Sequence, residues 1–200
     1  MRFLANVATL RTRWDWSTAA HPRQAVKWLA ESGCVRCGAV PLLACAVAWA
    51  LLALAIGLSG QPARAVWLPV KPEHYYLLQA AFTVPLLLGT WGLLGLVAHT
   101  LARALSGTGT LRSTVAATGY AYAVPVLFLF VLPDWVVFLG FGFQALAPAM
   151  RFYAPLAALA TWLLTAISIH DAHGLGRGRA IFTAWVALLV QAAAGTTLLR

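Results

Sequence analysis

Five long apolar runs constrain this chain more than any other feature of its sequence. A helix needs about 20 mostly apolar residues to cross the hydrocarbon core of a bilayer. The runs cover residues 40–59, 76–98, 115–132, 152–169 and 180–199, and none holds a charged side chain in its interior. The sequence therefore predicts an all-α integral membrane protein, folded as a bundle of five transmembrane helices.

The composition supports lipid as the solvent of this chain. Of its 200 residues, 62% are hydrophobic and only 10% are charged. A soluble domain is about half apolar and about a quarter charged, so this chain has too little polar surface to cover a water-soluble fold. Intrinsic disorder is excluded for the same reason, because disordered chains are poor in apolar residues.

The positive charges predict the orientation of the bundle. The chain has 14 Lys and Arg against 5 Asp and Glu. Cytoplasmic loops of membrane proteins carry an excess of Lys and Arg. With the N-terminus in the cytoplasm, ten basic residues lie inside, in the segment before the first run and in the connections at 99–114 and 170–179. The other four basic residues lie outside. We attribute the charge to contact with anionic lipid rather than nucleic acid. The abundance of Arg and Ala favours a bacterial inner membrane.

Residues 133–150 are apolar but interrupted. Pro133 and Pro148 bound the segment, and Gly140 and Gly142 lie in its middle. Its unbroken apolar part is too short to span a bilayer, so we expect an interfacial or re-entrant segment. A sixth span is the alternative, but it would move the basic residues of the last connection to the outside.

The region before the first run is predicted to be a cytoplasmic or interfacial amphipathic segment, residues 1–37, ahead of a transmembrane domain at 38–200. Residues 3–10 show helical apolar spacing, which favours a short helix on the inner leaflet. Pro22 is suited to the first position of a second helix, which should run to about Glu31. The polar segment is too long for a cleavable signal peptide.

Residues 75–135 carry an ordered pattern that resembles the YIP family (Ypt/Rab-interacting proteins) in its bacterial form. The pattern consists of Pro85, Trp91, His99, Leu101, Ala102, Arg103, Gly107, Gly109, Thr114, Gly119, Tyr120, Ala121, Pro125, Leu132, Pro133 and Asp134. Residues 170–180 (HDAHGLGRGRA) look like the loop before the last span of that family. The resemblance implies five spans with a cytoplasmic N-terminus.

The resemblance implies little chemistry. Eukaryotic relatives bind prenylated small GTPases and shape early secretory membranes, an activity that a bacterium does not need. Bacterial members look like non-enzymatic membrane proteins. We therefore expect an accessory or scaffold subunit of a larger membrane complex, whose partners are the lipid bilayer and other membrane subunits or further copies of the chain. No catalytic residue and no cofactor is predicted.

A component of a small-molecule or ion transporter is the first alternative function. Ionisable residues within the bilayer mark transport paths, and the predicted spans contain none, which argues against transport by this chain alone. Small residues and prolines within the spans are expected to set helix packing and kinks, with both prolines buried. These residues are Pro85, Gly89, Gly92, Gly95, Gly119 and Pro125.

A cytoplasmic-side metal or haem site is the second alternative. Cys34 and Cys37 form a Cys-x-x-Cys, which is half of a zinc site. The predicted topology places His99, His170 and His173 on the same side, so Cys2His2 ligation or haem held by two histidines is conceivable. Free thiols are the simpler expectation for cytoplasmic cysteines.

The loop at 106–114 is rich in glycine and hydroxyl side chains. It lacks the Gly-Lys-Ser/Thr ending of a phosphate-binding loop. We expect a turn in which Ser113 or Thr114 caps the third span, with Arg103 and Arg112 beside it as contacts for a lipid phosphate.

Overall fold

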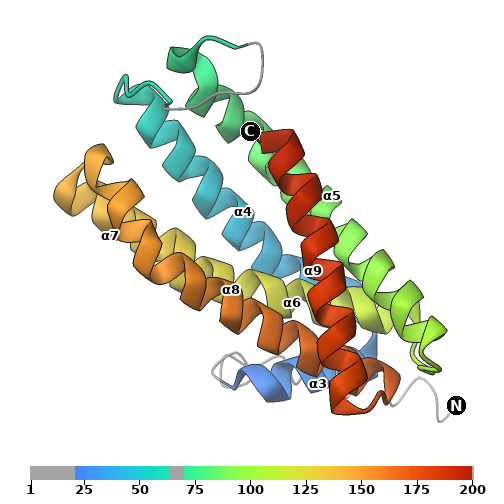
Figure 1. Ribbon diagram of the computed structural model, residues 1–200. Helices are drawn as coiled ribbons and strands as arrows, with labels where there is room; N and C mark the ends of the chain where they lie inside the picture. Colours follow the sequence, from blue (N-terminus) through green and yellow to red (C-terminus); the bar gives the residue numbers. More distant parts are fainter. Residues whose placement is uncertain (1–20, 64–69, 200) are drawn as a thin grey trace, which may run out of the picture.

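The computed structural model describes residues 21–63 and 70–199, with side chains as far as residue 195, and all of its regular structure is helical (Figure 1). The predicted helix at residues 3–10 lies outside these ranges. The elements are α3 Pro22–Ser32, α4 Val35–Leu58, η1 Pro72–His74, α5 Tyr75–Ala104, α6 Leu111–Val126, η2 Leu127–Val131, α7 Leu132–Phe141, α8 Phe143–His173 and α9 Arg177–Leu199.

Five of the described helical stretches are long and apolar enough to cross a membrane, which confirms the predicted fold class. They are α4, η1 with α5, the continuous stretch α6–η2–α7, α8, and α9. Their outer surface exposes large apolar side chains such as Phe141 and Phe152, as expected where the solvent is lipid. The orientation in the membrane stays a prediction.

The helix α3 closes one end of the bundle, which we call the α3 end. Pro22 stands in its first turn and Gly33 ends it in the left-handed conformation, so the helix expected from Pro22 to about Glu31 is present. Val26 and Leu29 are fully buried and pack with Tyr120 of α6. The apolar face of α3 is thus covered by protein. The α5–α6 loop and the α8–α9 turn lie at the same end (Figure 1).

The segment 133–150 forms a helical hairpin. It comprises most of α7 and the beginning of α8, which meet at Gly142, a residue with φ of 79° that favours glycine. The π-helical η2 lies just before Pro133, and there the N–H of Leu132 donates to the carbonyl of Leu127. The hydrogen-bond ladder is therefore already displaced where Pro133 lacks its N–H, and the helix continues. The depth of this hairpin in the bilayer stays a prediction.

This continuation corrects one expectation. The third candidate span runs from Leu111 to Phe141 and includes Asp134, which is only 8% exposed. The run predicted from the sequence, residues 115–132, holds no ionisable residue, but the helix continues past it through Asp134. Pro133 marks a wide turn of a continuing helix, and the sequence alone presented it as a stop.

Close backbone contact joins α4 to α6. A Cβ placed on Gly38 would lie 2.2 Å from the carbonyl oxygen of Ala116. A Cβ on Gly119 would lie 2.7 Å from the carbonyl oxygen of Gly38. Only glycine allows the two backbones to approach this closely, which is how helices gain packing energy in lipid.

Replacing Gly38 with alanine is expected to destabilise the fold by about 1–3 kcal/mol, because the new methyl group must push two helix backbones apart. The measurement is the midpoint of thermal unfolding in detergent. Gly92→Ala is the matched control, since nothing lies within 4 Å of a Cβ at that position. Equal unfolding midpoints for the two variants would contradict the close α4–α6 contact.

Candidate functional site

The most extensive polar contacts between helices surround His173 at the α3 end. The backbone N–H of Thr108 donates to the carbonyl oxygen of His173 at 3.1 Å, which ties the α5–α6 loop to the end of α8. Arg103 closes the same loop by donating from Nη1 to the carbonyl of Gly107 at 3.2 Å. We call this cluster of His173, His99, Thr114, Gly107 and Gly109 the histidine junction.

The imidazole of His173 is 2% exposed and bonds across helices. Its Nε2 lies 2.7 Å from the hydroxyl of Thr114 on α6. The Thr114 hydroxyl donates its single proton to the carbonyl of Thr110 at 2.9 Å. It therefore accepts from His173, which assigns the Nε2–H tautomer and leaves Nδ1 unprotonated in the neutral ring.

Gly107 and Gly109 make room for this ring. A Cβ on Gly109 would lie 2.1 Å from the carbonyl oxygen of Ala172 and 2.9 Å from Nδ1 of His173. A Cβ on Gly107 would also lie 2.9 Å from that nitrogen. The spacing Gly-x-Gly in this loop thus has a steric reason, which is the close approach of loop backbone to α8.

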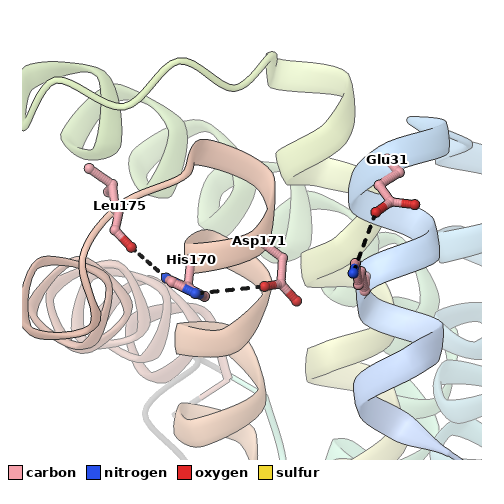
Figure 2. Close-up of polar contacts among 5 residues, drawn as sticks. Glu31, His170, Asp171 and Leu175 are labelled. Carbon is pink, nitrogen blue, oxygen red and sulfur yellow. Dashed lines mark hydrogen bonds and ion pairs between the residues drawn. The ribbon is translucent and has the colours of Figure 1, made fainter.

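His99 is the second histidine of the junction. Its ring centroid lies 5.3 Å from that of His173, and Nδ1 of each ring is buried and has no hydrogen-bond partner within the described part of the chain. His170 points elsewhere, toward the carbonyl oxygen of Leu175 in the α8–α9 turn, with Asp171 at 4.0 Å on its other side (Figure 2). The structure thus brings two of the three candidate histidines together.

The cysteine pair takes a form that was not expected. Cys34 and Cys37 are joined by a disulfide at the start of α4, so the expectation of free thiols is wrong for this structure. A disulfide offers no thiolate to zinc. Within residues 21–63 and 70–195, no group of three or more His, Cys, Asp or Glu side chains is placed to hold a metal ion. The Cys2His2 arrangement is therefore not assembled here.

The small residues predicted to set helix packing divide into two groups. Gly95 and Gly119 face other helices, and a Cβ on Gly95 would lie 2.7 Å from Val115 Cγ2. Gly89 and Gly92 are exposed, and a Cβ on either would meet nothing within 4 Å. Pro125 is buried as expected.

Pro85 is exposed on the outer face of α5, so its predicted burial is wrong. The helix α5 is apolar on all sides, and its sequence pattern therefore does not show which side faces the bundle. A site that sequence reasoning missed lies on that inner side. Trp91 is buried there, and its indole N–H donates to the carbonyl of Val115 at 3.1 Å.

The structure leaves both arginines that were expected at a lipid phosphate exposed. Arg103 and Arg112 are exposed at the α3 end. Their contact with lipid phosphate stays a prediction. The cap of α6 is Thr110, whose hydroxyl accepts from the Ser113 N–H at 3.1 Å. The helix starts at Leu111, earlier than the sequence suggested, so capping by Ser113 or Thr114 was wrong.

Asp134, a residue of the family pattern, forms a second polar contact between helices that the sequence did not predict. It lies on α7, at the end of the bundle opposite α3, and its Oδ1 accepts a hydrogen bond from the Tyr153 hydroxyl of α8. Gln191 on α9 is 4% exposed, and its Nε2 has no hydrogen-bond partner among the residues that the structure describes. A polar side chain within an apolar stretch was the available signal for both residues.

The chain matches a family model described as the Yip1 domain, over residues 16–199. It belongs to the Yip1 family. The family seen in the pattern at residues 75–135 and 170–180 is thereby confirmed, and the match also includes α3, while the bacterial origin stays a prediction. Yip1 family members are multi-pass membrane proteins and are generally non-enzymatic trafficking proteins. No match was found among curated proteins or among solved structures.

Removing the Thr114 hydroxyl from the histidine junction is expected to destabilise the fold. Thr114→Val keeps the shape of the side chain but leaves Nε2 of His173 buried without a partner, which is expected to lower the free energy of unfolding by about 1–3 kcal/mol. Thr100→Val is the control, since Thr100 is exposed and donates only to Leu96 of its own helix. Chemical unfolding in detergent compares the two. Unchanged stability of Thr114→Val would show that the His173 contact is unimportant.

Proposed function

We propose that this Yip1-family protein is a non-enzymatic accessory or scaffold subunit of a larger membrane complex in a bacterial inner membrane, with its N-terminus in the cytoplasm. The membership of a multi-pass family without a common enzymatic activity supports the proposal. The observation that carries it is an unfilled groove on the outer face of α5, beside α9.

The groove has a volume of about 410 Å³ and is lined by apolar and small residues. Phe82, Pro85, Gly89 and Leu93 of α5 line it, together with Ala194 of α9. The small residues bring the α5 backbone to the surface of the bundle. No other described helix of this chain occupies the position.

A transmembrane helix of another subunit is the occupant that fits this surface. Lipid gives no hydrophobic drive for helix association, so helices associate where small residues permit close van der Waals packing. Gly89 offers such a surface in the groove, and a Cβ there would contact no other described residue of the bundle. A scaffold would hold its partner here while the rest of its outer surface contacts lipid.

A transporter component is the second candidate, and two observations favour it. A cavity of about 670 Å³ lies between α4, α5, α6, α8 and α9. Asp134 lies within the third candidate span. Solute-specific flux into liposomes that contain only this chain would favour transport over the scaffold proposal.

The scaffold proposal predicts that filling the groove releases the partner. The variant Gly89→Leu is expected to fold normally, because no atom of the described residues lies within 4 Å of a Cβ at that position. It should lose at least about tenfold in co-purified partner, since large side chains prevent close helix approach. The measurement is quantitative mass spectrometry of mild-detergent pull-downs at native expression.

Gly140→Leu is the matched control, because Gly140 is exposed on α7 and equally free of neighbours. It should retain the partner. A natural chain that is strictly monomeric in native mass spectrometry, with nothing co-purified, would contradict the scaffold proposal, as would equal recovery of the partner by both variants.

A further inference from the structure

A second cavity, of about 330 Å³, lies at the end of the bundle opposite α3. It opens between α4, the beginning of α5, and the α7–α8 hairpin. Its walls carry five aromatic rings, from Trp49, Tyr75, Tyr76, Phe130 and Phe143. Asp134 also lines it. We call it the aromatic cavity.

The rings of the aromatic cavity support one another. Trp49 and Phe130 have centroids 5.4 Å apart, and Tyr76 and Phe143 are 5.7 Å apart in an edge-on arrangement. Each pair joins one ring from α4 or α5 to one ring from the η2–α7–α8 side. The aromatic walls are therefore held by contacts between helices, which makes their position depend on the tertiary fold.

Asp134 is the single acid among the residues that line this cavity, and it is 8% exposed. The neighbouring Trp135 fixes this part of α7, because its indole N–H donates to the Ala48 carbonyl at 3.0 Å. The Tyr153 hydroxyl donates to Oδ1 of Asp134. Within residues 21–63 and 70–195, no Lys, Arg or His forms an ion pair with this carboxyl group.

A carboxylate in a bilayer-spanning helix is costly without a positive partner, and such residues are functional by default. Aromatic faces attract cations, and recognition of quaternary ammonium groups by aromatic cages uses this attraction. The aromatic cavity combines both elements, and its volume lies in the range of small-molecule sites, about 300–1,000 Å³.

We propose that the aromatic cavity binds the ammonium group of an organic cation, with Asp134 as its counter-charge and the ring of Trp49 as part of the surrounding cage. The ammonium group comes either from a free small molecule or from the headgroup of an amine lipid. This binding site is independent of the α5 groove, and it requires neither the scaffold function nor transport.

The first experiment uses the full chain, purified in a maltoside detergent without amine lipids, and calorimetric titration with choline chloride. The natural chain is expected to bind choline and to reject its uncharged isostere, in which carbon replaces the quaternary nitrogen. This comparison of ligands needs no variant. Equal binding of the two compounds would overturn the proposal.

Variants then separate charge from structure. Asp134→Asn retains an oxygen that accepts from Tyr153 but removes the charge, and it should weaken choline binding at least about 30-fold. Trp49→Leu should weaken it about fivefold, whereas Trp49→Phe keeps an aromatic face and most of the affinity. Size-exclusion chromatography checks that each variant folds. Unchanged affinity in Asp134→Asn would show that the carboxyl group serves only to bind Tyr153, against the proposal.

A further experiment with lipids shows whether the ammonium group comes from a free small molecule or from a lipid headgroup. Native mass spectrometry counts the lipids retained by the chain from nanodiscs of phosphatidylethanolamine or of phosphatidylglycerol. Retention of phosphatidylethanolamine that is lost in Asp134→Asn assigns the ammonium group to a lipid headgroup. Choline binding without such retention assigns it to a free cation. Absence of both kinds of binding would overturn the proposal.

Discussion

Close contact between helix backbones holds this bundle together, because lipid chains are as apolar as the helices and provide no hydrophobic drive for association. The crossing of Gly38 and Gly119 brings α4 against α6. The helix α6 is then enclosed by α3, α4, α5 and α8, with Tyr120 fully covered. Gly95 and Trp91 bring α5 to the same helix. The remaining helices pack around this centre.

Two polar contacts between helices lie toward opposite ends of the bundle. At the α3 end, His173 bonds to Thr114 and fits against two loop glycines. At the opposite end, Asp134 bonds to Tyr153 beside a cavity of aromatic rings. The first contact joins helices to a loop and is fully closed. The second borders an open space, and this difference is why only the second is proposed to bind a ligand.

The sequence predicted the class of protein, the five spanning helices, the helix that begins at Pro22, and the family. It did so because length, apolar composition and proline position act locally. It failed at Pro85, which is exposed, and at Pro133, where the helix continues instead of stopping. Both errors have one origin: a proline was interpreted by its local chemistry, while the neighbouring helices and the π-helical turn decided its surroundings.

The amino-acid sequence by itself determined that lipid is the solvent and that five helices are long and apolar enough to cross it, since these follow from runs of apolar residues and from the scarcity of charge. The tertiary structure decided which glycines contact a backbone and which face lipid, which histidines meet, and what surrounds Asp134. In water, the apolar stripe of a helix shows its buried face. In lipid every face is apolar, so the choice of packing face depends on the fit of side chains between helices.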